Sequence, residues 1–420
     1  MKISCIVLIT ALGYVSLAQQ NLPRCSNIHT RKEVRSMPQN EWNVYTDVVK
    51  RMNDDGWTAW FSYVHTANFV PIHGNSMFFP FHRKFLQDYE SIGRRNYNNN
   101  FYLPYWDAGR DYSAPQRSAV LTDRYVGGNG RGNNRCVNNG FVDQLQVAYP
   151  NRHCLARQFD GPNNTIQTWY SPEYVASRLQ ANNRMAGLRP DIEYSIHGNV
   201  HIGIGGDMSQ EYSPNDPIFM LHHANMDRLW ARWQGMGDNL WKMDGPGPNG
   251  IRNLDLDDEI TNYNIPIRTV MELGYGDMCY QYGGSSSSNS PQDSRARTAS
   301  FQAAFAQTDQ DGDPTGSSDQ DLDSEDVVIN KVRSNGNVSP EVAKLFGVST
   351  NSNNARRSLY RRAVKPTTAK NNCTIIVPQP FPDSWISMHK YNKVDIQNHY
   401  KVAKEFIETL NKYKYVPAYC

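Results

Sequence analysis

The run from Asp216 to Gln234, DPIFMLHHANMDRLWARWQ, places two adjacent histidines, His222 and His223, within an apolar sequence. Its hydrophobic residues recur at spacings of three and four, which predicts an amphipathic helix. A single histidine in such a helix is more often a packed core residue than a metal ligand. The other histidines of the chain change this balance.

Two further clusters of histidines accompany the predicted helix. His197 and His201 stand in the sequence HGNVH, where a separation of four residues puts both imidazoles on one face of a helix. His65, His73 and His82 form another group near the N-terminus. Two groups of three histidines, spread over four predicted helical segments, favour two metal ions that face each other.

The donor set restricts the choice of metal. Imidazole as the only protein ligand suits copper, zinc, iron or nickel. Di-iron sites in helix bundles rely on Glu and Glu-x-x-His ligands, and this motif is absent. Two copper ions, each with three neutral histidines, would leave an open face for dioxygen. Because a ligating imidazole must be neutral, metal affinity is expected to fall as the pH drops through the histidine range.

The hydrophobic pattern predicts a mainly α fold with long loops and a partly disordered C-terminal extension. The predicted helices cover residues 41–52, 57–69, 78–95, 171–181, 189–201 and 216–234. Residues 108–165 are rich in Gly, Asn and Arg and are expected to form long loops over the core.

The N-terminus has the features of a secretory signal peptide over residues 1–18. Lys2 precedes an apolar run from Ile3 to Leu17, and small residues follow at the expected cleavage site. No later segment is long and apolar enough to cross a bilayer, so no membrane partner is expected. The formal net charge of +2 gives no overall field that would attract nucleic acid. We therefore expect a secreted, extracellular glycoprotein that begins near Gln19, with sequons at Asn163, Asn337 and Asn372.

An even number of cysteines remains once Cys5 is removed with the signal, which favours disulfides in a secreted chain. We propose the pairs Cys25–Cys279, Cys136–Cys154 and Cys373–Cys420 as the simplest arrangement, although six cysteines allow about fifteen pairings.

The composition changes after Tyr282. A Ser/Asp-rich linker is predicted over residues 283–330, and its acidic run from Asp309 to Asp326 is expected to be disordered by itself. The run reads either as a solvated linker or as a weak binding site for calcium or mineral, since its start imitates an EF-hand loop. Residues 331–420 form a basic extension, with an amphipathic helix predicted at Val394–Tyr413. The copper-binding domain is expected over residues 19–282.

Two segments carry a family resemblance. HGNSMFFPFHRKFLQDYE, from His73 to Glu90, resembles the first copper signature of tyrosinases and molluscan haemocyanins. DPIFMLHHANMD resembles their second signature, in which His223 is the ligand and Asp227 closes the motif. The resemblance covers roughly residues 40–282 and implies an antiparallel four-helix bundle that holds a dinuclear copper site. It implies one copper bound by His65, His73 and His82 and a second bound by His197, His201 and His223, with His222 as a neighbour.

The resemblance implies an enzyme, a tyrosinase or catechol oxidase that uses dioxygen to oxidise phenols to o-quinones. Such quinones crosslink or pigment extracellular matrix, so small phenols and catechols or the Tyr and Dopa side chains of matrix proteins are the expected substrates. Two alternatives share the copper site: an oxygen carrier like haemocyanin, and a structural matrix protein with a tyrosinase fold.

The chain departs from the family pattern at two places. Pro71 stands where many members have a cysteine in thioether linkage to a histidine. Gly198 follows His197 where many phenol-hydroxylating members have an Asn that helps a water take the phenol's proton, and Asn199 comes one residue later. Glu193 could position such a water or be a helix-surface residue. Catechol oxidation is therefore more secure than hydroxylation of monophenols.

Overall fold

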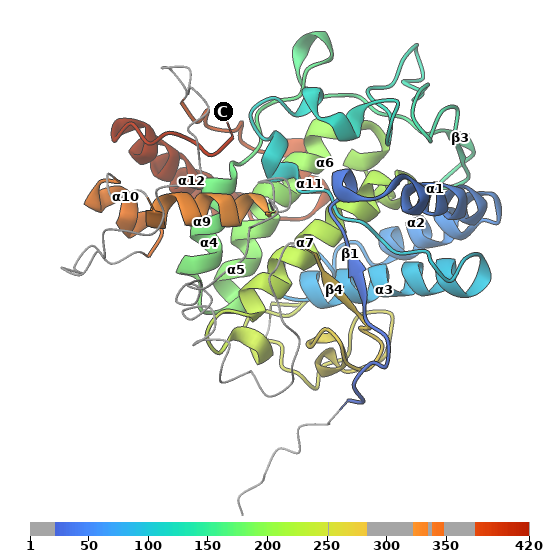
Figure 1. The fold of residues 1–420 in the computed structure, drawn as a ribbon, viewed down its shortest axis with the longest axis horizontal. Coiled ribbons are helices and arrows are strands. Elements are labelled where there is room, and N and C mark those ends of the chain that lie inside the picture. Colours follow the sequence, from blue (N-terminus) through green and yellow to red (C-terminus); the bar gives the residue numbers. More distant parts are fainter. Residues whose placement is uncertain (1–21, 251, 284–321, 335–337, 348–373, 420) are drawn as a thin grey trace, which may run out of the picture.

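The computed structural model describes residues 22–250, 252–283, 322–334, 338–347 and 374–419. This part of the chain is mainly helical, as predicted (Figure 1). The helices of the central part are α1 (Gln39–Asp54), α2 (Trp57–Ala67), α3 (Phe78–Asn96), α4 (Pro172–Ala181), α5 (Met185–Ile192), α6 (Gly198–Ile204) and α7 (Ile218–Gln234). Residues 108–165 contain only short 3₁₀ turns and two short strands, which agrees with the predicted loops.

Local sequence signals explain several helix boundaries. The hydroxyl of Ser171 accepts a hydrogen bond from the backbone N–H of Tyr174, and Pro172 occupies the first turn of α4. Gly56 precedes α2 with a φ of 87°, a left-handed conformation in which a residue with a side chain would be strained. The chain can therefore reverse between α1 and α2 within a few residues.

The predicted helix over residues 189–201 is not continuous, which corrects the sequence-based expectation. It consists of α5, a π-helical turn at Glu193–His197 and then α6. Pro190 lies inside α5, where it cannot donate a backbone hydrogen bond, and Ser195 departs from helical geometry with φ −131° and ψ −107°. Single π-helical turns of this kind occur often at functional sites.

Two small sheets are present in the described residues: one joins the two ends of the central part, and the other is a local hairpin. β1 (His29–Arg31) pairs in parallel with β4 (Tyr280–Tyr282), and β2 (Gln146–Val147) pairs in antiparallel with β3 (His153–Cys154). Each sheet lies beside a disulfide, Cys25–Cys279 and Cys136–Cys154 respectively, so both of these predicted pairs are confirmed. β1 lies ahead of the first predicted helix, in a segment for which no strand was predicted.

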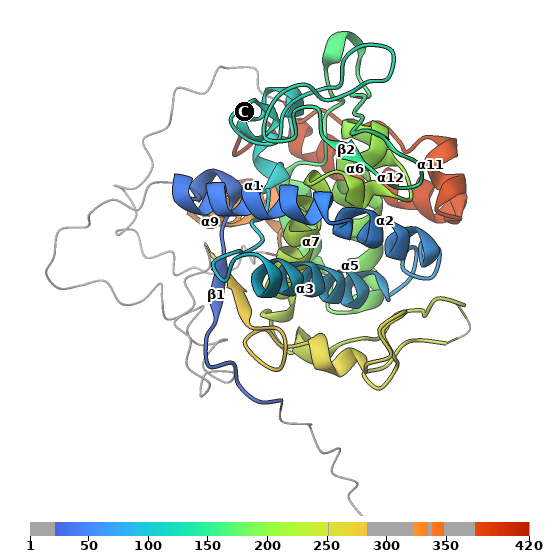
Figure 2. The ribbon, with the colours of Figure 1, turned by 90° about the vertical axis from the view of Figure 1, so that its right-hand side faces the viewer.

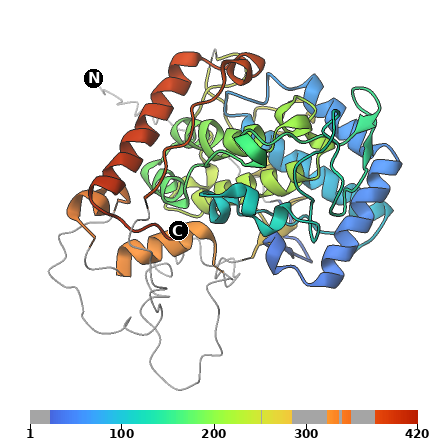
Figure 3. The same cartoon turned by 90° about the horizontal axis from the view of Figure 1, so that it is seen from above.

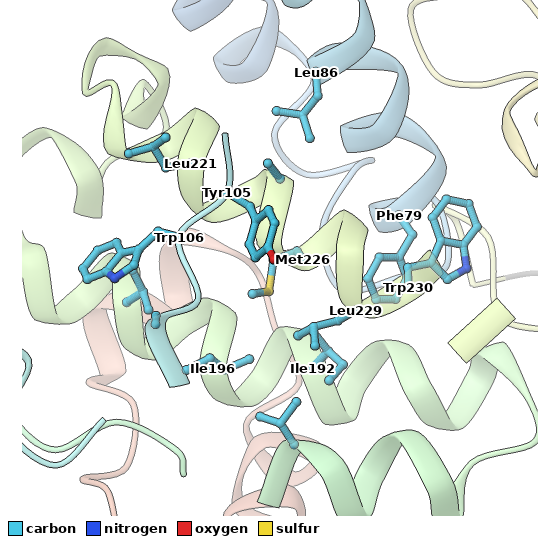
Figure 4. Close-up of a cluster of buried hydrophobic side chains, with 14 of the residues drawn as sticks. Phe79, Leu86, Tyr105, Trp106, Ile192, Ile196, Leu221, Met226, Leu229 and Trp230 are labelled. Carbon is cyan, nitrogen blue, oxygen red and sulfur yellow. The ribbon is translucent and has the colours of Figure 1, made fainter. Parts of the chain in front are cut away.

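The core lies between α3 and α7, which pack against each other (Figure 2). In Figure 4, Phe79 of α3 meets Trp230 of α7, with ring centroids 5.4 Å apart, while Ile192 and Ile196 approach from the α5 side. Burial of these aromatic and aliphatic side chains fixes the relative positions of the helices that carry the histidines.

Polar residues of both signature segments turn out to hold this core together. Asp227 of α7 accepts hydrogen bonds from Arg83 of α3 (2.5 Å), Tyr280 (2.6 Å) and Tyr282 (2.6 Å). Glu90 of α3 accepts from Arg31 of β1 at 3.0 Å. Although burial acts to raise the pKa of Glu90, the guanidinium of Arg31 and the imidazole of His29 lower it to about 2. These signature residues therefore join α3, α7 and the β1–β4 sheet.

In its described residues, the C-terminal extension packs against the central part with the helices α9 (Ser324–Ser334), α10 (Pro340–Leu345), α11 (Asp383–Met388) and α12 (Lys393–Lys412). Figure 3 shows α12 as a long helix along one side of the molecule, close to the predicted range of residues 394–413.

The end of the acidic run is folded, so the prediction of a disordered linker is wrong for Asp323–Asp326. Arg228 of α7 is buried and pairs with Asp323 at 2.9 Å and with Glu325 at 3.0 Å. Arg232, one turn later, pairs with Asp323 and Asp326. Paired with arginines, these carboxylates start α9 instead of remaining in solvent.

Several predictions lie outside the described residues. They are the signal peptide, the start of the acidic run that imitates an EF-hand loop, the sequons at Asn337 and Asn372, and the pair Cys373–Cys420. Among the described helices, none combines the length and apolar character that a membrane span requires.

Candidate dinuclear metal centre

His65, His73 and His82 come together at the buried side of α2 and α3. His65 lies on α2, His82 lies in the first turns of α3, and His73 lies in the turn that connects these helices. One ring nitrogen from each lies within 4.8 Å of the others. The sequence-predicted first group is therefore assembled as a compact cluster of three imidazoles.

His197, His201 and His223 form the second group by the same criterion of 4.8 Å. The π turn ends at His197, and His201 follows one turn later on α6, so both imidazoles share one face, with centroids 4.7 Å apart. His223 reaches them from α7, with its Nε2 atom 3.2 Å from that of His201.

The two groups face each other. The rings of His82 and His223 stack with centroids 4.2 Å apart, and the rings of His73 and His197 lie 5.9 Å apart. Each of the two contacts joins a member of the first group to a member of the second. The arrangement can hold two metal ions side by side.

Backbone carbonyls set the tautomer of most of these imidazoles. The Nδ1 atoms of His65, His73, His82 and His201 lie 2.6–2.8 Å from the carbonyl oxygens of Glu211, Phe69, Phe78 and Met208. Because a carbonyl oxygen can only accept, Nδ1 carries the proton and Nε2 keeps its lone pair. This is the usual way in which proteins orient a metal-binding histidine.

Burial keeps all six imidazoles neutral. It lowers the pKa of His65 to about 3 and that of His201 to about 4, even though hydrogen bonds to backbone carbonyls act to raise both. It also holds the pKa values of the remaining four well below the ordinary value, with neighbouring histidines adding to the effect. Neutral imidazole is the form that a metal requires.

His222 differs from its neighbour. Its Nε2 atom lies 3.2 Å from the carbonyl oxygen of His197 and donates to it, so this nitrogen has no lone pair for a metal. The structure therefore separates the two adjacent histidines, as predicted: His223 lies within the second group, and His222 supports the backbone beside it.

Glu193 is fully buried, which excludes the alternative that it is a helix-surface residue. Its carboxylate accepts hydrogen bonds from the backbone N–H of Gly74 (2.7 Å), from Arg189 (2.8 Å) and from the hydroxyl of Tyr391 (2.6 Å). Burial raises its pKa, and the charge of Arg189 opposes this rise. Asn199 is also buried, and its Oδ1 atom has no hydrogen-bond partner among the described residues.

The C-terminal extension covers both groups, an arrangement that the sequence leaves open. The ring of Phe381 fills the space beside Gly198, where an ideal Cβ atom would lie 2.2 Å from its Cζ atom. The ring of Trp385 lies 5.8 Å from that of His201, and the ring of His389 lies 5.2 Å from that of His73. The dense aromatic character of residues 379–391 was the available signal.

The donor set fits copper. The Nε2 atoms of His65, His82 and His197 are buried without a hydrogen-bond partner among the described residues, which is costly unless a ligand satisfies them. Each group consists of histidines alone, with no carboxylate in it. Six neutral imidazoles without a bridging carboxylate suit a pair of copper ions.

Comparisons with known proteins agree with this geometry. Residues 27–236 match the family model described as the common central domain of tyrosinase. The chain is 30% identical over 292 residues to the tyrosinase ustQ of Aspergillus flavus, covering 62% of this chain and 81% of that one. It is 34% identical over 177 residues to a tyrosinase of Streptomyces lincolnensis, covering 39% and 64% respectively.

A similar fold occurs in the solved polyphenol oxidase of Thermothelomyces thermophila, with a TM-score of 0.50 at 24% identity, over 62% of this chain and 90% of that one. The family model matches half of the chain. The chain therefore belongs to the tyrosinase family, whose members are copper oxidoreductases that use two copper ions and dioxygen to oxidise phenols.

Proposed function

We propose that this chain is a secreted oxidase that converts catechols, and more slowly monophenols, to o-quinones, with His65, His73 and His82 holding one copper and His197, His201 and His223 the other. The supporting observation is the pair of facing histidine groups, in each of which one ring nitrogen per histidine lies within 4.8 Å of the others. When bound, the two copper ions transfer electrons from the phenol to dioxygen. The chain's own residues orient the reactants, exclude water and accept protons.

Catechols are the proposed main substrates because the proton-accepting groups near the site are engaged. A monophenol needs a base for its single hydroxyl proton. Glu193 lies next to the site, but Tyr391 and Gly74 both donate to its Oε1 atom. Gly198 offers no side chain beside His197, and the ring of Phe381 fills that space. Hydroxylation of monophenols would therefore require that Tyr391 leave Glu193.

The extension is proposed to keep the oxidase in a resting form. Phe381, Trp385 and His389 lie against both histidine groups, so a phenol ring would compete with them for space. Release or cleavage of this part of the extension would open the site. The quinones then formed would crosslink or pigment matrix, with Tyr or Dopa side chains of matrix proteins among the substrates.

Two observations support an extracellular location. The disulfides Cys25–Cys279 and Cys136–Cys154 belong to an oxidising compartment. Asn163, the sequon residue within the described part, is exposed. We propose that the chain acts in an extracellular matrix.

The covering extension also favours a second function, that of an oxygen carrier. A site that is closed to phenols but reached by dioxygen would bind oxygen reversibly without oxidising a substrate. The dense aromatic contacts of Trp385 and His389 over the histidines are the observation that supports this alternative.

Oxygen consumption by the copper-loaded chain tests the proposal. The full chain and protease-treated protein would each be given a catechol and a monophenol, with His223→Ala as the control. We expect rapid uptake with the catechol after proteolysis, slower uptake with the monophenol and none in the variant. Reversible oxygen binding without consumption, before and after proteolysis, would contradict the oxidase function and support that of an oxygen carrier.

A further inference from the structure

His389 is a buried histidine outside the two groups of three. It follows α11 in the C-terminal extension, and only 3% of its surface is exposed. Its ring lies 5.2 Å from that of His73, which equals the separation of His73 from His65 and from His82. The imidazole of His389 therefore lies beside His73, at the edge of the cluster within 4.8 Å that His65, His73 and His82 form.

The tautomer of His389 is set as in the first group. Its Nδ1 atom lies 3.0 Å from the carbonyl oxygen of Trp385, four residues earlier. The Nδ1 atoms of His73 and His82 make the same contact with Phe69 and Phe78, also four residues earlier. In each case the carbonyl can only accept, so Nε2 keeps the lone pair that a metal ion needs.

The described surroundings of His389 supply no hydrogen-bond partner to its Nε2 atom. The neighbouring rings are those of Phe69, Trp385 and Tyr391, with centroids 4.6, 3.9 and 4.7 Å away. An apolar ring would fill this space equally well, so packing alone does not account for an imidazole at this position.

We propose that His389 is a further metal ligand, which binds the ion held by His65, His73 and His82 while the extension is in place. This inference rests on the proposed function of the two histidine groups. The extension would then block the site in two ways. Its side chains fill the space that a phenol needs, and His389 would occupy a coordination position that dioxygen or a phenol needs. The same ligand would give the extension another effect, the retention of copper in the full chain.

The variant His389→Phe tests the proposal because it keeps a ring of similar size and removes the nitrogen. The full chain would be loaded with Cu(I), and release of copper to a Cu(I) chelator would be followed over time. We expect one of the two ions to leave about tenfold faster than in the unchanged protein, as is common when a metal site loses an interaction. The other ion should leave at the original rate.

Trp385→Phe is the matched control. It reduces the bulk of the cover while leaving His389 in the chain, so copper release should stay close to that of the unchanged protein. Equal release from His389→Phe and the unchanged chain would overturn the proposal and leave His389 as a packing residue. If His389→Phe does not fold, as judged by its circular dichroism, His389→Gln takes its place with the same expectation.

No substrate enters this measurement, so its outcome is independent of the oxidase assay. Suppose that the protein oxidises catechols after proteolysis, but that His389→Phe and the unchanged chain release copper at equal rates. The proposed oxidase function would then stand, and the proposal that His389 is a metal ligand would be wrong. Faster copper release from His389→Phe, with no oxidation of any phenol, would support His389 as a metal ligand and contradict the proposed oxidase function.

Discussion

The hydroxyl of Tyr391 donates a hydrogen bond of 2.6 Å to Oε1 of Glu193, and so joins the C-terminal extension to the π-helical turn that carries His197. Both groups are buried, and burial together with the nearby carboxylate holds the pKa of Tyr391 well above its ordinary value. The phenol therefore remains protonated and acts as a donor. A side chain of the extension thus occupies the carboxylate of the turn that carries His197.

Removal of this hydroxyl should loosen the extension. Hydrogen bonds to charged groups contribute about 1.5–3 kcal/mol, so Tyr391→Phe should raise catechol oxidation by the full chain about tenfold or more. The activity of protease-treated protein should not change. Tyr413→Phe, at an exposed tyrosine of the same extension, serves as the control. Equal activity of the full-length Tyr391→Phe and unchanged chains would show that this contact does not hold the cover.

Gly198 and Phe381 should be coupled. In Gly198→Ala the new Cβ atom would lie 2.2 Å from Cζ of Phe381, closer than real Cβ contacts, so the ring must move. We expect the full chain to become more active and more sensitive to proteolysis near the extension.

The double variant Gly198→Ala/Phe381→Ala separates this clash from a direct effect on His197. Because the truncated side chain no longer meets the added methyl group, the two substitutions should be strongly non-additive in thermal unfolding. Additive effects would mean that the methyl group added by Gly198→Ala acts directly on His197 and not through Phe381.

His222 and His223 should differ sharply when replaced. His223→Ala removes a member of the second group and should leave about one copper per chain, with loss of oxidase activity. His222→Ala removes a donor to the carbonyl oxygen of His197, so two coppers should remain, bound more weakly. Metal analysis after dialysis distinguishes the two. Loss of a full copper from His222→Ala would reverse the assignment.

Much of this centre could be predicted because its signals are local. The spacing of His197 and His201 fixes a shared helix face, and the hydrophobic pattern around His223 fixes its helix. The structure brings all six predicted histidines together in two groups. The π turn was missed because it changes the hydrogen-bond register without changing the hydrophobic pattern.

The cover could not be predicted because it depends on contacts between segments far apart in the sequence. Nothing near Phe381 shows that it fits beside Gly198, and nothing near Glu193 shows that Tyr391 will bind it. The same holds for Asp323 and Glu325, which read as part of a solvated acidic run until Arg228 is placed beside them. Composition describes such a segment in isolation, whereas its burial depends on the partner surface.

Arg228 should be essential for docking α9. It is buried among Asp107, Asp323 and Glu325, so Arg228→Met would leave these carboxylates without their main counter-charge. Breaking a buried ion pair from one side typically costs about 3–5 kcal/mol. Thermal unfolding should therefore shift strongly downward. Lys401→Met, which removes an exposed partner of Glu405, should leave the unfolding temperature unchanged. A small shift for Arg228→Met would indicate that α9 contributes little to stability.

The stability of the metal-free protein should depend on pH through its buried imidazoles. Burial lowers the pKa of His65 from 6.5 to about 3 and that of His201 to about 4, and it lowers the pKa values of six further histidines well below 6.5. Below pH 6.5 the unfolded chain therefore binds protons that the folded chain does not.

Their contribution to stability is complete above pH 6.5 and is lost as the pH falls toward 3–4, by about 1.4 kcal/mol per pH unit for each imidazole. Asp207, whose pKa burial raises to about 6, acts in the opposite direction. Since eight imidazoles outweigh it, the unfolding temperature of chelator-treated protein should fall between pH 7.5 and 5.5. His65→Phe should show a shallower fall because one such group is gone. An unfolding temperature that stays constant over this range would mean that protons reach the imidazoles in the folded state, and that the centre is open to water.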